Sequence, residues 1–412
     1  MAPEYDVLVV GARVAGASLA LLLGRQGRRV LLVDRDRFPS DTLSTHFLGA
    51  PAVASLERLG VLADVEANGL RRLTRTRTYV GDCVLEGPAV PVVPGYALAP
   101  RRDRLDAILI RHATAHPSVE MRERTRAVEL LREGTRVVGA AVAGPDGQRA
   151  EIRARAVVGA DGKSSDVARW VEASAYETVP ALRPAYYGYF RGVEPLGEPT
   201  LEIFFAGDHI GFVFPMEPDV DCLAVEMQPA DFDVFRRDPQ RCLEARLRAL
   251  PGMARRMRGA VLEGPVKGTR GIENYFRVPY GPGWALTGDA GYCKDPSTGL
   301  GIGDAFTQAF LLAEAIHRGL DGDWDEALSA FHQRRDEAMM PLYRATLAYT
   351  RAGAVPEESL DLLRAVLSSP PFARMLATGF AATLAQAPGF PAPLRARLGQ
   401  IAQAFAARRG DA

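Results

Sequence analysis

A short turn from Gly11 to Gly16 stands between an apolar run and a helix-forming stretch near the start of the chain. Small residues in such a turn let a pyrophosphate reach backbone N–H groups at the positive end of a helix. Asp34 follows 18 residues after Gly16, close to the spacing of about 20 at which an acidic side chain binds an adenosine ribose. The unit predicts a dinucleotide site built from Gly11, Val14, Ala15, Gly16, Asp34 and Arg35. The alternative is a glycine-rich turn that binds no nucleotide.

One residue departs from the usual G-x-G-x-x-G fingerprint, because Arg13 occupies the position of the middle glycine. We expect its side chain either to point away from the phosphates or to contact them directly. The unit as a whole, rather than its glycines alone, therefore predicts dinucleotide binding.

Two later segments narrow the choice of dinucleotide. An apolar strand ends in Asp161-Gly162, and another ends in Gly288-Asp289. Each pair alone is also typical of an ordinary turn. Together, in this order, the three landmarks resemble the para-hydroxybenzoate-hydroxylase-like (group A) FAD monooxygenases, whose relatives include flavin-dependent halogenases and geranylgeranyl reductases. The resemblance covers roughly residues 5 to 345.

The resemblance implies roles for individual residues toward a non-covalently bound FAD. It implies that Asp289 binds the ribityl or pyrophosphate region and that Asp161 and Gly162 support the cofactor and the nicotinamide donor. It also implies that Arg102 reaches the flavin phosphate or ribityl chain. Arg101 and Arg104 compete for this role, and a solvated arginine cluster is the alternative.

A further segment has a physical reason to face the flavin. Its residues Pro296, Gly299, Leu300 and Gly301 precede a helix. Proline suits a helix entry, and free N–H groups there can stabilise the charge that reduced flavin carries near N1 and O2; ordinary helix capping is the alternative. His46 is a weak candidate for orienting substrate or flavin, and otherwise a surface or cap histidine. No metal site is expected, because the histidines and cysteines lack ligand spacing.

The implied reaction uses NAD(P)H to reduce FAD, after which O₂ forms a flavin C4a-hydroperoxide that oxygenates an electron-rich substrate. Aromatic residues at alternating positions are expected to line the pocket for a planar, apolar, secondary-metabolite type of molecule, although some must be core. These residues are Tyr187, Tyr189, Phe204, Phe205, Phe212 and Phe214.

Other functions remain open. A flavin-dependent reductase of the geranylgeranyl-reductase type is the main alternative, because the stretch from Gly211 to Pro215 is close to the Y-x-W-x-F-P region of that group. A halogenase is less favoured, since the same stretch lacks both tryptophans of the halogenase G-W-x-W-x-I-P segment. A scaffold that has lost turnover is the third alternative, which the intact acidic landmarks argue against.

The elements that must position these residues follow from periodicity and turn signals. Strands are predicted over 5–10, 30–33 and 284–286, helices over 17–24, 102–116 and 231–250, a strand meander over 119–142 and 151–158, aromatic strands over 186–228, and helices after 303. The predicted fold class is α/β, a Rossmann-like FAD-binding domain with a β-sheet substrate domain and a helical C-terminal tail.

The predicted FAD-binding domain is discontinuous and comprises residues 1–75, 97–172 and 268–350. Residues 76–96 and 173–267 form the predicted substrate-binding β domain, and 351–412 a C-terminal helical segment that is either a packed helix pair or a frayed tail.

Composition favours a small-molecule enzyme. The 50 basic and 50 acidic residues of the 412-residue chain balance, so no net field draws the protein toward nucleic acid or an anionic membrane. The N-terminal residues lack the pattern of a signal peptide, and no apolar run is long enough for a membrane span. We therefore expect a cytoplasmic protein, monomeric or homodimeric, whose partners are its substrate and O₂.

Overall fold

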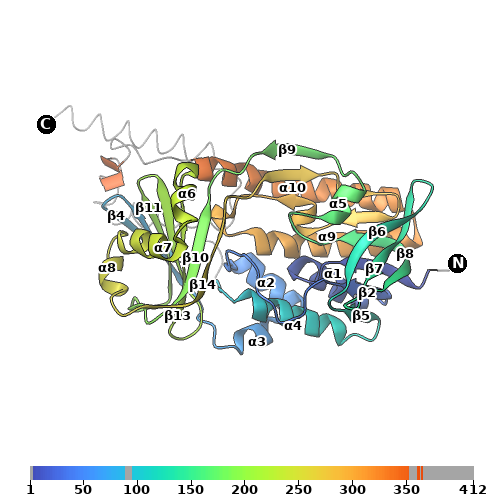
Figure 1. The fold of residues 1–412 in the computed structure, drawn as a ribbon, viewed down its shortest axis with the longest axis horizontal. Coiled ribbons are helices and arrows are strands. Elements are labelled where there is room, and N and C mark those ends of the chain that lie inside the picture. The colour runs from blue at the N-terminus through green and yellow to red at the C-terminus, as the bar shows by residue number, and fades with distance from the viewer. Residues whose placement is uncertain (1–2, 89–94, 352–359, 362, 365–412) are drawn as a thin grey trace. The chain divides into compact units, whose positions relative to one another are not determined.

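A computed structural model describes residues 3–88, 95–351, 360–361 and 363–364 (Figure 1). The chain falls into two compact units, and each is described by itself. The first unit comprises Met1–Leu70, Leu98–Ala181 and Ile272–Ala338; the second comprises Arg71–Ala97, Leu182–Gly271 and the described residues from Met339 onward. The expected C-terminal helical segment, 351–412, lies almost entirely outside the described residues.

The first unit is built on an eight-stranded sheet whose central strands are parallel, in the order β17-β8-β1-β2-β5. Their bounds are Trp284–Leu286, Arg149–Gly159, Tyr5–Val10, Val30–Val33 and Val119–Arg122. The antiparallel strand β16 (Tyr280–Gly281) pairs with β17. Strands β1, β2 and β17 are buried along almost their whole length, as expected for parallel strands covered on both faces.

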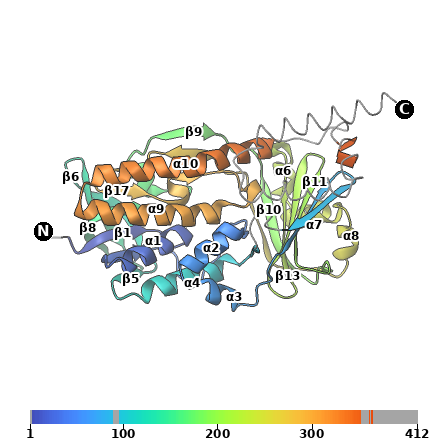
Figure 2. The same cartoon turned by 180° about the vertical axis from the view of Figure 1, so that it is seen from behind.

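Two different layers cover this sheet. The antiparallel strands β6 (Arg126–Glu133) and β7 (Arg136–Ala143) lead into β8, and their apolar residues pack against one face of β1 and β2. The second layer is helical: α1 (Val14–Arg25) packs against both α4 (Arg102–Thr114) and α9 (Gly301–Asp321) (Figure 2).

Smaller elements complete the first unit. They are α2 (Ala50–Arg58), α3 (Leu62–Glu66), α5 (Asp166–Trp170), the 3₁₀ turns η2 (Gly288–Ala290) and η3 (Pro296–Thr298), and a three-stranded sheet of β18 (Tyr292–Cys293), β15 (Asn274–Arg277) and β9 (Ala175–Val179). The predicted strand–helix–strand opening and the predicted meander are both present.

The second unit is built on a seven-stranded sheet in the order β14-β10-β13-β12-β11-β3-β4. The strands are β14 (Val261–Thr269), β10 (Ala185–Arg191), β13 (Val220–Glu226), β12 (His209–Pro215), β11 (Thr200–Ala206), β3 (Arg75–Val80) and β4 (Cys83–Pro88). One face packs on α7 (Pro239–Arg248) and α8 (Met253–Arg256) through a shared apolar cluster (Figure 2).

The helix expected over 231–250 is broken in the structure. The 3₁₀ turn η1 (Pro229–Asp231) and α6 (Phe232–Phe235) come first, and α7 then starts afresh at Pro239. The break follows from local chemistry, because proline cannot continue a helix and the Asp238 carboxylate caps the new one by accepting from Arg241 N–H.

The last described helix, α10 (Trp324–Arg351), begins in the first unit, where Arg334 pairs with Glu314 of α9 at 2.9 Å. The helical prediction after residue 303 is therefore confirmed as far as the chain is described. None of the helices in the described ranges is long and apolar enough to cross a membrane. The α/β fold class, with a dinucleotide-type domain and a second sheet, is confirmed.

Candidate functional site

Four sequence landmarks meet at one edge of the first unit's sheet. Strands β2, β1, β8 and β17 are neighbours and parallel, with Val10 paired to Val33 and to Gly159, and Gly159 paired to Leu286. Their carboxyl ends therefore lie together. Asp34, the Gly11–Gly16 turn, the Asp161 turn and the Gly288 turn each follow one of these ends, which is where open parallel sheets bind nucleotides. This carboxyl edge is the candidate site.

Glycine is required where the landmark turns approach one another. A Cβ on Gly11 would lie 2.4 Å from the carbonyl oxygen of Ala160, and the φ of Gly11 is +102°. A Cβ on Gly16 would lie 1.8 Å from the carbonyl oxygen of Gly11, and one on Gly288 would lie 2.8 Å from the Cβ of Ala15. The three turns thus pack closely against one another at the start of α1, and we call this arrangement the glycine cradle. The start of a helix favours an anion such as a pyrophosphate.

Asp34 is held by backbone N–H groups. Its Oδ2 accepts from Ala12 at 2.7 Å and its Oδ1 accepts from Asp36 at 2.8 Å. Burial raises the pKa of the Asp34 carboxyl, and these two bonds oppose the rise. Each oxygen keeps a second lone pair, so the carboxylate is oriented and can still accept from ribose hydroxyls. Arg35 next to it is exposed.

The Arg13 guanidinium ties three segments together. Its guanidinium donates to Asp36 and to Asp106, each at 2.9 Å. It also donates to the carbonyl and hydroxyl of Ser40, at 3.2 and 3.1 Å, and to the carbonyl of Asp41 at 3.3 Å. The replacement of the fingerprint glycine therefore supplies a clamp between the start of α1, the loop after β2, and α4.

Arg102 shares the Asp106 carboxylate with Arg13. Its Nε and Nη2 donate to the two oxygens of Asp106 at 3.1 Å, and Arg102 itself is buried. Arg102 is also close enough to Asp289 to lower the pKa of that carboxyl. The structure thus brings Arg102 to the carboxyl edge. Arg101 is the residue that precedes α4, and Arg104 is exposed.

Asp161 caps a helix. Its Oδ1 accepts from the hydroxyl of Ser165 at 2.5 Å, and its Oδ2 accepts from the N–H groups of Asp166 and Val167 at 2.8 and 3.2 Å. These bonds fix the turn before α5, with Gly162 at a φ of +78°. Asp161 therefore sets the shape of the turn that packs on Gly11.

The side chain of Asp289 is accessible to solvent even though dense protein surrounds it. That surrounding raises the pKa of the Asp289 carboxyl, and the nearby Asp304 carboxylate adds to the rise, whereas Arg102, Lys163 and Lys294 oppose it. An accessible carboxylate in such a setting is a candidate acceptor for ligand hydroxyls.

Three side chains that the sequence analysis missed hold the backbone of the Asp289 turn. The hydroxyl of Tyr275 lies 2.7 Å from the Asp289 carbonyl and 3.1 Å from the Lys163 carbonyl, so it bridges the two landmark turns. Arg277 donates to the Ala290 carbonyl at 2.8 Å. Arg335, fully buried, donates to the carbonyls of Arg277 and Gly291 at 3.0 and 3.4 Å. Their distance along the chain hides this grouping from sequence reasoning.

The segment before α9 adopts the predicted helix entry. Pro296 opens η3, Gly299 has a φ of +68°, and Leu300 precedes the first residue of α9, Gly301. The carbonyl of Gly299 lies 3.4 Å from the Thr45 hydroxyl. His46, the residue after Thr45, is completely buried and has a φ of +61°, so the alternative of a surface histidine is wrong.

The aromatic candidates of the second unit divide between two faces of its sheet. Phe204 belongs to the helix-covered core and stacks on Tyr79 at 4.3 Å, so its prediction as a substrate residue is wrong. The other five lie on the opposite face. Ala224 is paired to both Tyr187 and Phe212, and Cys222 to both Tyr189 and Phe214. Phe205 is paired to Ile210, on the face of Phe212, and packs against Val80 and Leu85. Alternation along the strands explains the division.

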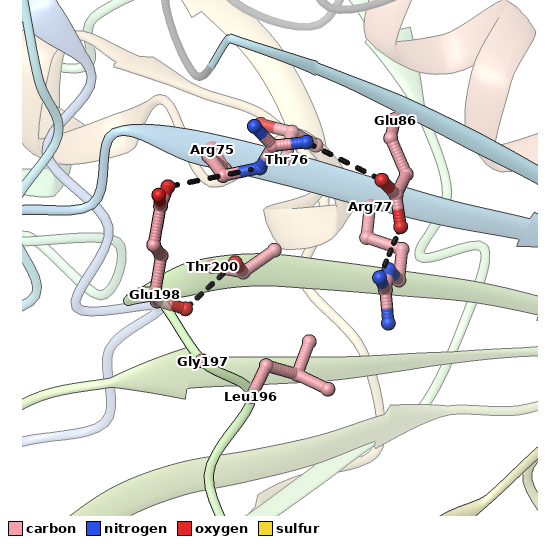
Figure 3. Close-up of a pocket in the computed structure, with 8 residues that line it drawn as sticks. All are labelled: Arg75, Thr76, Arg77, Glu86, Leu196, Gly197, Glu198 and Thr200. Atoms are coloured by element: carbon pink, nitrogen blue, oxygen red, sulfur yellow. Dashed lines mark hydrogen bonds and ion pairs between the residues drawn. The ribbon is translucent and has the colours of Figure 1, made fainter.

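A surface recess on the second unit is a different kind of site. It is lined by Arg75, Thr76, Arg77, Glu86, Leu196, Gly197, Glu198 and Thr200 (Figure 3). Its arginines are paired with its glutamates, Arg75 with Glu86 at 3.3 Å and Arg77 with the same carboxylate. This recess is polar and lacks the glycine cradle that a dinucleotide needs.

Comparison with known proteins identifies an FAD binding domain in the same part of the chain. Residues 4–187 match the family model described as an FAD binding domain. The chain is 29% identical over 347 residues to a menaquinone reductase of Mycolicibacterium smegmatis, a match that covers 79% of this chain and 80% of the relative. It is 36% identical over 170 residues to 6-methylpretetramide 4-monooxygenase of Streptomyces rimosus, 39% of each chain.

The fold also has a close solved counterpart. The structure of a flavin-dependent brominase superimposes with a TM-score of 0.74 at 20% identity, covering 98% of this chain and 99% of that chain. At that identity the likeness concerns the fold alone. The family match over residues 4–187 and the glycine cradle at the carboxyl edge agree, and this part of the chain belongs to the family described as an FAD binding domain.

Proposed function

We propose that the chain is an FAD-dependent monooxygenase that uses NAD(P)H and O₂ to oxygenate an apolar, aromatic small molecule. The observation that carries the proposal is the meeting of Asp34, the glycine cradle and Asp289 at one sheet edge. The similarity to 6-methylpretetramide 4-monooxygenase, 36% identity over 170 residues, supports the reaction class.

The residues present fit FAD. The start of α1, closed by Gly11 and Gly16, would hold the pyrophosphate, and Asp34 would accept from the adenosine ribose. Asp289 would accept from the ribityl or pyrophosphate region, with Arg102 nearby to balance its charge. When bound, the flavin supplies the electron transfer and oxygen activation. The chain's own part is to bind, orient and exclude water.

The proposed substrate surface is the sheet face that carries Tyr187, Tyr189, Phe212 and Phe214. Tyr187 and Tyr189 meet edge to face at 5.9 Å, and Phe212 and Phe214 stack at 5.8 Å. The two aromatic pairs lie on β10 and β12, which flank β13 in the sheet, and they offer flat, apolar contact to a planar molecule. This surface fits a phenolic or polyketide substrate better than a charged one.

A flavin-dependent reductase is the second candidate. The observation that favours it is the menaquinone reductase match, which spans about four fifths of both chains, whereas the monooxygenase match is confined to 39% of each. Under this candidate the same aromatic face would contact an isoprenoid or quinone. Halogenase chemistry is less favoured, because Phe212 and Phe214 stand where that subfamily has its two tryptophans.

The two candidates differ in the atom that the substrate gains. Purified protein with NADPH or NADH is incubated under ¹⁸O₂ with phenolic and polyketide compounds and, separately, with menaquinone, and the products are analysed by mass spectrometry. A product that carries one ¹⁸O atom is expected for the monooxygenase. A product that gains only hydrogen, and that also forms in the absence of oxygen, would contradict the monooxygenase proposal and support the reductase.

A further inference from the structure

A buried ion pair stands at the start of α9. Lys294 lies in the segment between β18 and η3, and Asp304 lies in the first turn of α9. The Lys294 ammonium donates to the Asp304 carboxylate, and the two side chains are only 2% and 8% exposed. Two buried charges of opposite sign therefore lie beside the helix entry formed by Pro296 to Gly301.

The position of the pair gives it an electrostatic consequence. No side chain of the described residues caps α9, so the N–H groups of Gly301, Ile302 and Gly303 keep the positive potential of a helix start. An unpaired Asp304 would cancel that potential, because its carboxylate lies within the same turn. Lys294 neutralises the carboxylate and leaves the helix start positive.

The pair also acts on the rest of the carboxyl edge. Asp304 and Lys294 change the pKa of the Asp289 carboxyl in opposite directions, so all three groups lie within electrostatic range. Because the side chains of Lys294 and Asp304 are buried, a charge added or removed at either residue is screened less than one at the surface.

We propose that Lys294 and Asp304 are a charge-balancing pair that sets the redox balance of the bound flavin through the potential at the start of α9. The inference rests on the proposed function, since it requires FAD at this edge. A flavin gains negative charge near N1 and O2 when it is reduced, and a positive helix start favours that state. Both residues are positioning residues, because neither needs to touch the flavin.

A merely structural role makes a different prediction. If the pair only held the Lys294–Asp304 loop closed, breaking it from either side would weaken the binding of oxidised and reduced FAD alike. An electrostatic role gives opposite signs for the two single variants: Lys294→Met leaves an extra negative charge, and Asp304→Asn leaves an extra positive one.

The test measures the reduction potential of bound FAD by equilibration with reference dyes, in the parent, Lys294→Met, Asp304→Asn and the double variant. We expect the preference for reduced over oxidised FAD to fall about tenfold in Lys294→Met and to rise about tenfold in Asp304→Asn. Each change equals about 30 mV for a two-electron couple. The double variant should return close to the parent, because it removes both charges. Glu314→Gln, at a half-exposed pair farther along α9, is the matched control and should leave the potential unchanged.

Shifts of the same sign in both single variants, or no shift in either, would overturn the inference while leaving the proposed function in place. If Lys294→Met does not fold, as judged by circular dichroism and urea unfolding of the apoprotein, the near-isosteric Asp304→Asn decides the sign alone. A parent protein that binds no FAD would overturn the proposed function, and this inference with it.

Discussion

Replacing Arg13 by glycine restores the usual dinucleotide fingerprint, and we predict that it weakens the protein. Fingerprint reasoning alone predicts a neutral or favourable change. In the structure Arg13 donates to two carboxylates, Asp36 and Asp106, each at 2.9 Å, and to the loop from Ser40 to Asp41. Glycine would remove all of these bonds from the fully buried Asp106 and from the loop that follows Asp34.

The size of the expected loss in stability depends on the contacts that Asp106 keeps in the variant. Breaking a buried ion pair and leaving a charge uncompensated costs about 3–5 kcal/mol. Here Asp106 keeps Arg102 at 3.0 Å, and the Arg13 side chain is 23% exposed. We therefore expect a loss of roughly 2–3 kcal/mol in the free energy of unfolding, mainly from hydrogen bonds to charged groups. Glycine itself is tolerated before a helix, so backbone conformation adds only a few tenths of a kcal/mol.

The assay is urea unfolding of the apoprotein, with FAD titration of the same variants. Arg13→Gly should lower both the unfolding free energy and the affinity for FAD, and Arg13→Lys should fall between it and the parent because lysine lacks the planar fork of donors. Arg37→Gly, at an exposed position of the same loop, should change stability by less than about 0.5 kcal/mol. An Arg13→Gly protein as stable as the parent, with equal or tighter FAD binding, would refute the clamp.

Three further perturbations test other parts of the account. Tyr275→Phe removes the hydroxyl that bridges the Asp289 and Lys163 carbonyls and should weaken FAD binding about fivefold, which corresponds to about 1 kcal/mol. The control Tyr5→Phe loses a hydrogen bond of 2.5 Å to Glu120, far from the carboxyl edge, and should leave FAD binding unchanged. Equal effects of the two variants on FAD affinity would contradict the positioning role of Tyr275. The raised pKa of the Asp289 carboxyl means that this group lowers the stability of the apoprotein as pH rises through its folded pKa. Asp289→Asn should therefore be more stable than the parent at neutral pH, equally stable below about pH 4, and weaker in FAD binding. Urea titrations at several pH values check this, and a variant less stable than the parent at neutral pH would count against it. Arg256→Met should cost roughly 3 kcal/mol in urea unfolding, because the buried carboxylate of Glu202 loses the guanidinium that holds it at 2.6 Å and keeps the Tyr79 hydroxyl at 3.2 Å. An unchanged free energy of unfolding would contradict this expectation.

Local signals were enough to predict much of the first unit. Apolar runs bounded by turns gave the strands that precede Gly11, Asp34 and Asp161. Their neighbourhood in one parallel sheet then follows from βαβ connection rules, which place all carboxyl ends at the same edge. A residue-level signal therefore existed for each landmark of the candidate site.

Other features depend on contacts between distant parts of the chain. The partners of Arg13 lie up to 93 residues away, and the Tyr275 hydroxyl reaches the Lys163 carbonyl 112 residues away. No periodicity encodes such pairs. The Phe204 error has a related cause: alternation divides a strand between two faces, but the sequence does not say which face the helices cover.

The measurement that tests the central claim most directly is FAD binding to the purified protein. The apoprotein of the parent and of a Gly16→Val variant is titrated with FAD, and binding is measured by flavin absorbance and fluorescence. The valine side chain would overlap the Gly11 carbonyl, since even a Cβ on residue 16 would lie 1.8 Å from its oxygen. Circular dichroism and urea unfolding show whether that variant is folded. The account predicts saturable binding of one FAD per parent chain, and loss of binding in the folded variant. A parent chain that binds no flavin, or a folded Gly16→Val protein that binds it as tightly as the parent, would contradict the placement of the cofactor at the carboxyl edge.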